Sequence, residues 1–218
     1  MKRIAVKAVA EISKHSEVTA SKVVDEKAVG FLAALISHSD TSIKRNVCKS
    51  LSHIASHSID LAEHVVEAEI FPRIFNCLKD GDVEIRKNAA SCICEISKHS
   101  ADLAKMITHA GGVIYMVEFC NNSSEADIAP GITGLGYLGK EESLAMQVIA
   151  NQGVQPIKQV LLSSRNIDLL VIAARSLSEL GKHSPDHAKA LAEHGVLTAL
   201  LQIYLNKSLT NKTADDEE

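Results

Sequence analysis

The tripeptide Lys-His-Ser returns along this chain at a fixed interval, and this interval constrains the fold more than any other feature. The recurring histidines, counting one in a Ser-His-Ser variant, are His15, His57, His99 and His183, so successive spacings are 42, 42 and twice 42 residues. The missing copy falls at residue 141, where Lys140 is kept and Glu141 replaces the histidine. A fixed period of this length, without insertion or deletion, predicts a stack of similar units.

One 42-residue unit has the pattern of three helices. In the unit 58–99, Ser58 is placed to cap a short helix, and a second helix begins near Phe71 and ends within residues 79–82. A third follows, with its apolar residues at helical spacing: Ile85, Ala89, Ile93 and Ile96. In the last copy Ser184 and Pro185 mark the same start. Three helices per unit predict an all-α, armadillo-type right-handed superhelical solenoid rather than a two-helix HEAT array.

Apolar residues recur at the same interval and predict rows of core side chains. The first row is Ile12, Ile54, Ile96, Leu138 and Leu180, and the second is Val23, Val65, Ile107, Ile149 and Leu191. Aromatic residues are only 3% of the chain and tryptophan is absent, so we expect an aliphatic core. Gly111, Gly153 and Gly195 recur between the first and second helices, where we expect a tight turn with positive φ.

The period also predicts the domain boundaries. We expect one armadillo-repeat domain over 1–205, with full repeats at 16–57, 58–99, 100–141 and 142–183, partial repeats at 1–15 and 184–205, and a flexible acidic tail over 206–218. The first residues are in the register of a third helix, and no third helix is expected after residue 209. We therefore expect a fragment of a longer array, whose uncapped apolar ends favour self-association.

Charge and cysteine content exclude several classes of function. The net charge of -4 disfavours nucleic-acid binding, which needs a basic face, and no apolar stretch approaches the roughly 20 residues that span a bilayer. The five cysteines are unevenly spaced, and Cys92 and Cys94 point in different directions on one helix, so we expect reduced, mostly buried thiols. No catalytic constellation is present. We predict a protein that is not an enzyme and has no cofactor.

Two motifs resemble ligand-binding sites, a row of histidines and a glycine-rich segment. The row of histidines could bind metal or sense pH, but copies one repeat apart are separated by roughly 8–10 Å, too far to share one ion. We interpret Lys and His as the end of a third helix and Ser as the start of the next. Residues 134–139 match G-x-G-x-x-G, yet the register places them within a third helix. There the glycines would permit close helix packing, and Pro130 with Gly131 would bend or loosen the helix.

Four segments resemble one family of armadillo proteins. They are Ser58–Asp80 (SIDLAEHVVEAEIFPRIFNCLKD), Glu95–Ser100 (EISKHS), Ala110–Val113 (AGGV) and Pro130–Tyr137 (PGITGLGY). They resemble the armadillo protein of the ciliary central apparatus, known in animals as a sperm-associated antigen. The resemblance implies a structural protein of the 9+2 axoneme in motile cilia or flagella, needed for motility, with other central-apparatus proteins and tubulin as candidate partners. A cytosolic or nuclear adaptor of the catenin or import-receptor type is the alternative.

Third helices line the concave side of armadillo proteins, so we expect the binding residues there. Import receptors carry a tryptophan and an asparagine ladder on this face. Here the tryptophan positions hold Lys7, Lys49, Ser91, Thr133 and Arg175, and the asparagine positions hold Glu11, His53, Glu95, Tyr137 and Glu179. The missing ladders disfavour capture of a basic localisation peptide.

One turn earlier, Arg3, Arg45 and Lys87 form a basic strip with Lys7 and Lys49. We hypothesise that this strip docks an acidic partner segment; the alternative is an ordinary solvated face. The candidate protein-binding residues are Arg3, Lys7, Arg45, Lys49, His53, Lys87, Glu95, Tyr137, Arg175 and Glu179.

Overall fold

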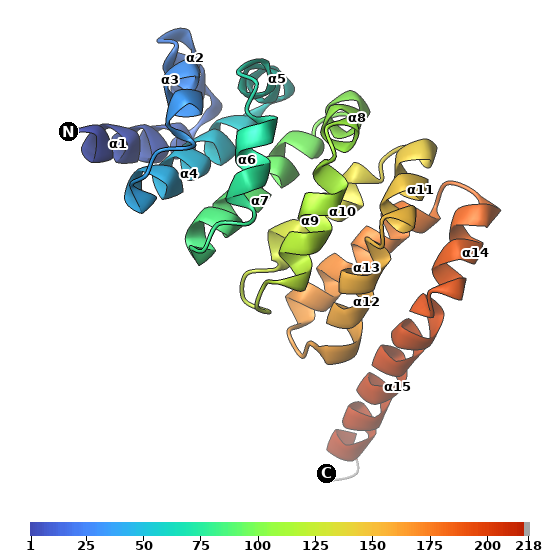
Figure 1. Cartoon of the computed structure of the whole chain (residues 1–218). Coiled ribbons are helices and arrows are strands. Elements are labelled where there is room, and N and C mark those ends of the chain that lie inside the picture. The colour runs from blue at the N-terminus through green and yellow to red at the C-terminus, as the bar shows by residue number, and fades with distance from the viewer. Residues whose placement is uncertain (216–218) are drawn as a thin grey trace.

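The computed structural model describes residues 1–215, and the side chains of residues 1–205. This part of the chain contains fifteen α-helices and no strand, joined by short turns into one elongated stack (Figure 1). The helices are α1 Lys2–His15, α2 Glu17–Asp25, α3 Ala28–Leu35, α4 Thr41–His57, α5 Ile59–Glu67, α6 Phe71–Cys77, α7 Val83–Ser97, α8 Ala101–His109, α9 Gly112–Asn121, α10 Ala129–Leu138, α11 Glu142–Ala150, α12 Val154–Ser163, α13 Ile167–Gly181, α14 Pro185–Glu193 and α15 Val196–Asp215.

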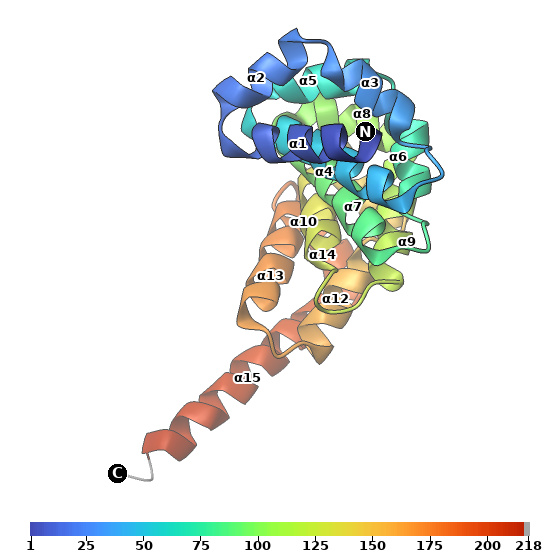
Figure 2. The ribbon, with the colours of Figure 1, turned by 90° about the vertical axis from the view of Figure 1, so that its left-hand side faces the viewer.

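The helices repeat in threes with the 42-residue period, which confirms the predicted all-α solenoid. Each unit has a short first helix (α2, α5, α8, α11), a second helix (α3, α6, α9, α12) and a third helix (α4, α7, α10, α13), and α1 has the register of a third helix. In Figure 2, α7, α10 and α13 each lie to the same side of the second helix of their own unit. The third helices therefore form one face of the stack and the second helices the opposite face.

The predicted core rows are buried, with one exception. In the first row the side chains of Ile54, Ile96, Leu138 and Leu180 are all inaccessible to solvent, and the second row is buried throughout. The prediction for Ile12 is wrong, because 48% of this residue is exposed. Among the described residues, α1 packs chiefly against α4 and α2, and this packing leaves Ile12 uncovered. Exposed apolar side chains also occur on α15, where Leu197 and Leu201 are 59% and 60% accessible.

A residue in the left-handed region separates the first and second helices of each unit. Gly111 and Gly195 have φ values of 86° and 74°, as predicted. The prediction for Gly153 is wrong: its φ is -61°, and the preceding Gln152 has φ 64°. Gly153 is required for space, because a Cβ there would lie 2.5 Å from Cγ1 of Val148.

The glycine-rich third helix α10 starts later than its counterparts. Pro130 lies in its first turn, where the missing N–H costs no intrahelical hydrogen bond, so the proline starts a shorter helix and does not lie in its interior, where the predicted bending or loosening would occur. The predicted close packing is confirmed. A Cβ on Gly136 would lie 2.9 Å from Cα of Ser176 on α13, and one on Gly134 would lie 2.5 Å from Cε of Met116.

The C-terminal end differs from the predicted tail. The backbone of α15 continues to Asp215, so residues 206–215 of the expected tail are helical, and residues 216–218 lie outside the described residues. No glycine or proline follows Gly195 to end the helix. Within the described residues, no helix combines the length and the hydrophobicity that a membrane crossing requires.

Candidate functional site

The structure brings all ten candidate binding residues onto the face formed by α1, α4, α7, α10 and α13, which we call the third-helix face. Arg3 and Lys7 lie on α1, Arg45, Lys49 and His53 on α4, Lys87 and Glu95 on α7, Tyr137 on α10, and Arg175 and Glu179 on α13. The 42-residue register therefore places them on equivalent helices. Their electrostatic environments differ.

Carboxylates of the following unit pair with three cations of the basic strip. Arg3 bonds Asp40, and Arg45 bonds Asp82 through Nε to Oδ1 at 2.9 Å and through Nη2 to the second oxygen. Lys87 Nζ lies 3.2 Å from a carboxylate oxygen of Asp127. These pairs leave little charge for an acidic partner and favour the solvated-face interpretation of the strip.

Asp40 and Asp82 have a second role, because they cap third helices. Each accepts hydrogen bonds from backbone N–H groups of the first turn, Asp40 from Ser42 at 2.9 Å and Asp82 from Ile85 at 3.1 Å. The Arg45 guanidinium, together with this cap, lowers the pKa of Asp82. This pairing is not among the sequence-based predictions, although the 42-residue spacing of the two aspartates is a signal for it.

The glutamates of the face are also paired. Glu11 accepts from Lys49 at 2.9 Å, which lowers the pKa of the Glu11 carboxyl, and Glu179 accepts from Lys182 at 2.5 Å. Glu95 likewise bonds Lys98. His53 bonds the carbonyl of Ala10 through Nδ1 at 2.8 Å, and burial lowers its pKa.

Two cations of the candidate set differ from the rest. Lys7 and Arg175 are exposed, and neither has an ion pair with any described residue. Lys7 lies on α1 at one end of the stack, whereas Arg175 lies between neighbouring repeats, at the rim of a pocket. Away from the end of the stack, Arg175 is therefore the candidate cation of the third-helix face that is most available to a partner.

The pocket lies between α10 and α13 and has a volume of ≈ 250 Å³. The residues that line it include Thr133, Gly136, Tyr137, Ile172, Arg175 and Glu179. Thr133 and Arg175 occupy tryptophan-ladder positions, and Tyr137 and Glu179 occupy asparagine-ladder positions. The sequence placed these four on the binding face but gave no indication that Gly136 and Ile172 complete a pocket, because this depends on how closely α10 approaches α13.

The recurring histidines join neighbouring repeats. His57, His99 and His183 each place Nε2 within 2.6 to 2.7 Å of a backbone oxygen 44 residues earlier, namely those of Ser13, Ala55 and Gly139. Because a carbonyl oxygen only accepts, Nε2–H is the donor in each ring. These oxygens lie at the C-terminal ends of the preceding third helices, so each ring caps the helix of the previous unit. The sequence predicts only that the histidine ends its own third helix; the structure adds that its ring caps the third helix before it.

The other residues of the Lys-His-Ser motif vary in their contacts. Lys98 donates to the carbonyl of Ser56 at 2.7 Å, and Lys140 bonds the carbonyl of Lys98 in the copy that lacks a histidine. The serine cap is confirmed at Ser100, whose Oγ accepts from Leu103 N–H at 3.1 Å. Ser58 and Ser184 occupy the N-cap position as predicted, but the prediction that their side chains cap the helix is wrong, because neither accepts a hydrogen bond from a backbone N–H of the first turn. The Ser184 hydroxyl bonds His187 instead.

The thiols and the acidic or imidazole side chains form no metal centre in residues 1–205. No group of three or more such side chains is placed to hold an ion. All five cysteines are free and buried, as predicted, and burial raises the pKa of Cys94 to about 12.

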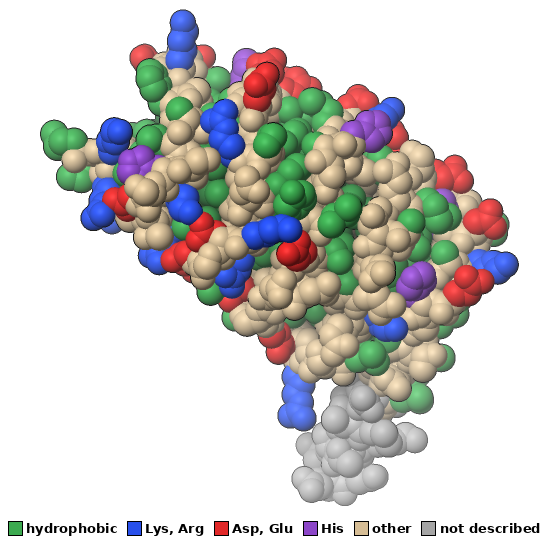
Figure 3. Space-filling view, viewed as in Figure 1, with side chains coloured by type: hydrophobic (Ala, Val, Ile, Leu, Met, Phe, Trp, Pro, Cys, Tyr) green, Lys and Arg blue, Asp and Glu red, His purple; other side chains and the backbone are tan. Residues whose placement is uncertain are grey.

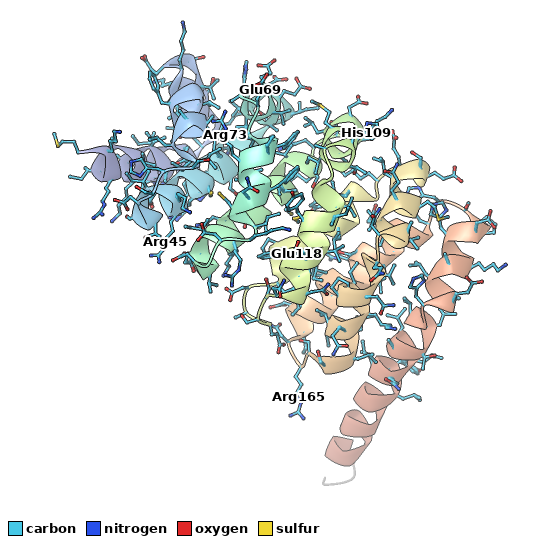
Figure 4. The ribbon with its side chains drawn as sticks, viewed as in Figure 1. Arg45, Glu69, Arg73, His109, Glu118 and Arg165 are labelled. Atoms are coloured by element: carbon cyan, nitrogen blue, oxygen red, sulfur yellow. The ribbon has the colours of Figure 1, made fainter. Side chains whose placement is uncertain are left out.

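The opposite face, formed by the second helices, carries a mixture of apolar and charged side chains (Figure 3). Glu118 lies near its middle (Figure 4) and pairs with Lys79 at 2.6 Å, and Lys79 also lies 4.7 Å from the centroid of the Tyr115 ring. Arg73, on the same face, donates to the carbonyl of Ala33 at 2.6 Å. These charged groups are engaged within the protein.

Comparisons with known proteins identify the architecture. The HEAT repeat family matches residues 70–100, which span α6 and α7. A designed armadillo repeat protein is similar to the chain with a TM-score of 0.87 and 17% identity, covering 92% of this chain and 84% of its own. A second designed armadillo repeat protein, solved in complex with peptide (KR)4, has a TM-score of 0.86 and 18% identity over 91% of this chain and 83% of its own.

A third solved structure, a computationally designed armadillo repeat protein for modular peptide recognition, has a TM-score of 0.85 and 18% identity, with coverage of 91% and 83%. No curated protein matches the sequence. The chain has the fold of an armadillo/HEAT-like repeat solenoid.

Proposed function

We propose that this protein is a non-catalytic scaffold that binds other proteins through its third-helix face and that it acts in the central pair of the axoneme. The repeat solenoid is an architecture suited to protein binding, because stacked helices create an extended continuous surface. The observation that carries the proposal is the third-helix face itself. It contains a side-chain-sized pocket and the uncompensated cation Arg175.

The axonemal part of the proposal is supported by the sequence resemblance. The segments 58–80 and 130–137 resemble the central-apparatus armadillo family, and the second of these forms the short, glycine-rich helix α10. Gly136 and Tyr137 of that helix line the pocket. The proposed partners are other central-apparatus proteins and tubulin, and the proposed role is to support ciliary or flagellar motility.

Localisation of the tagged full chain in motile ciliated cells tests this function. We expect enrichment along the axoneme and retention after detergent extraction. Lys7→Glu combined with Arg175→Glu should reduce retention, whereas Lys22→Glu combined with Arg165→Glu should not, because Lys22 and Arg165 are exposed cations outside the third-helix face. A signal confined to cytosol or nucleus contradicts the axonemal proposal, and equal retention of both variants contradicts the role of the face.

A cytosolic or nuclear adaptor that captures a basic peptide is the second candidate. The likeness to a designed protein in complex with peptide (KR)4 favours it, as does the row Glu11, Glu95 and Glu179 on the third-helix face. Each of these glutamates is already paired with a lysine of this chain, which argues against it. The same localisation experiment separates the two candidates.

A further inference from the structure

The pocket between α10 and α13 depends on a close approach of two third helices. Gly136 lies where the backbones meet, since a Cβ there would lie 2.8 Å from Oγ and 2.9 Å from Cα of Ser176. The equivalent positions in the other complete units hold Ser52, Cys94 and Ser178, all of which carry a side chain. Only a glycine at this position leaves both the close packing and the floor of the pocket intact.

The size of the pocket limits its occupant. Its volume of ≈ 250 Å³ is below the range of about 300–1,000 Å³ that accommodates drug-sized ligands. Its lining is mostly apolar, with Ile172 on one wall and the half-buried ring of Tyr137 on another. A single large apolar side chain of a partner fits these dimensions and this lining.

The charged side chains at the rim of the pocket determine which residues of a partner fit beside the inserted apolar side chain. Arg175 is exposed and has no anionic partner among the described residues, while Glu179 is neutralised by Lys182. Lys140 lies 5.4 Å from the centroid of the Tyr137 ring and adds a second positive charge near the pocket. The net local charge is therefore positive, and its complement is a carboxylate beside the inserted apolar group.

We propose that this pocket binds a partner protein through one large apolar side chain that is flanked by acidic residues. The inference rests on the proposed function, because it specifies which segment of a partner the third-helix face would bind. It also moves the acidic docking site from the basic strip of the first repeats, where every cation except Lys7 is paired, to the α10 and α13 pair.

Titration of the full chain with short peptides tests this proposal. The probes are Glu-Glu-Phe-Glu-Glu, the same peptide with glycine in place of phenylalanine, and the same peptide with glutamine or lysine in place of every glutamate. The readout is the methyl NMR signal of Ile172 at low salt. We expect the Glu-Phe peptide to bind about tenfold more tightly than the glycine peptide, because the aromatic group leaves water. We also expect it to bind about fivefold more tightly than the glutamine peptide.

Variants locate the binding. Arg175→Glu should weaken the Glu-Phe peptide by about fivefold or more, and Ser178→Trp, which places a large ring at the exposed pocket edge, should weaken it by about tenfold. Arg165→Glu is the matched control, since Arg165 is exposed and points away from the body of the stack (Figure 4). Unchanged far-UV circular dichroism and melting show that each variant is folded.

Three results would overturn the proposal: tighter binding of the lysine peptide, equal binding to wild type and Arg175→Glu, or no shift at millimolar Glu-Phe peptide. These outcomes are independent of the cell experiment. Axonemal retention that depends on the third-helix face, together with no peptide binding, overturns only the pocket inference. Loss of axonemal localisation with intact peptide binding overturns only the proposed function.

Discussion

Replacing His99 by alanine tests whether the recurring histidine holds neighbouring repeats together. The ring donates from Nε2 to the carbonyl of Ala55 at 2.6 Å, and Ala55 is fully buried. Without the ring this acceptor loses a partner at the C-terminal end of α4. Leaving a buried polar group unsatisfied costs about 1–3 kcal/mol, so we expect the free energy of unfolding to fall by about that amount.

His15 provides a matched control within the same chain. It has the same repeat position as His99, but it is exposed and its ring has no hydrogen bond to a carbonyl of any described residue. His15→Ala should change stability by less than about 0.5 kcal/mol. The opposite substitution, Glu141→His, should restore the missing copy by donating to the carbonyl of Ser97, 44 residues earlier, and should stabilise the protein by about 1 kcal/mol.

Urea unfolding followed by circular dichroism at 222 nm is the assay, with thermal melting as a second measure. For a chain of this size, 1 kcal/mol corresponds to about 2–4 °C in Tm. We expect His99→Ala to melt several degrees below wild type, His15→Ala to match wild type, and Glu141→His to melt higher. Equal effects of His99→Ala and His15→Ala would show that the buried carbonyl of Ala55 is not the cause of the stabilisation.

Three further predictions concern packing, thiol reactivity and charge. Gly136→Ala should destabilise the protein by about 1–3 kcal/mol in urea unfolding because its Cβ would collide with α13. Gly30→Ala, with open space around its Cβ, should stabilise it by up to about 1 kcal/mol. The thiols, including Cys94 with its raised pKa, should resist an aromatic disulfide reagent at pH 8 in native protein and react after unfolding; fast native reaction of all five would contradict their burial. Arg45→Ala should raise the lowered pKa of Asp82 toward its ordinary value in an NMR titration. A carboxyl whose pKa is lowered in the native state contributes stability above its unfolded pKa of about 3.9, and this contribution is lost as the pH falls through the native pKa. The variant should therefore lose less stability than wild type below about pH 4. An unchanged Asp82 pKa would show that the pair does not form.

The sequence predicted the fold well because the repeat supplies an internal alignment. One unit read for helical spacing predicted all the others, including the burial of Ile54 and Leu180. The predicted burial of Ile12 was wrong because the register defines only which face of the helix a residue occupies. Burial also requires a neighbouring helix on that face. Pro130 was assigned to a helix interior, since the period does not reveal that α10 begins later than α7 or α13.

The candidate site was predicted less completely. Register placed Tyr137 and Arg175 on the correct face, but it could not show that Asp82 reaches Arg45 or that Arg175 remains unpaired. Whether such a pair forms depends on the side-chain rotamers of residues that are far apart in the sequence, 37 positions for Arg45 and Asp82. The pocket also depends on the distance between two helix backbones, to which Gly136 contributes by lacking a side chain.

Site-specific photo-crosslinking shows whether partners bind the third-helix face. A benzophenone amino acid replaces Val171, which is 41% exposed on α13 one turn before Arg175, or Ile114, which is 58% exposed on the second-helix face. Both versions of the full chain are expressed in motile ciliated cells, irradiated, and their adducts identified by mass spectrometry. We predict adducts with central-apparatus proteins from position 171 and not from position 114. Adducts from position 114 alone would contradict this prediction.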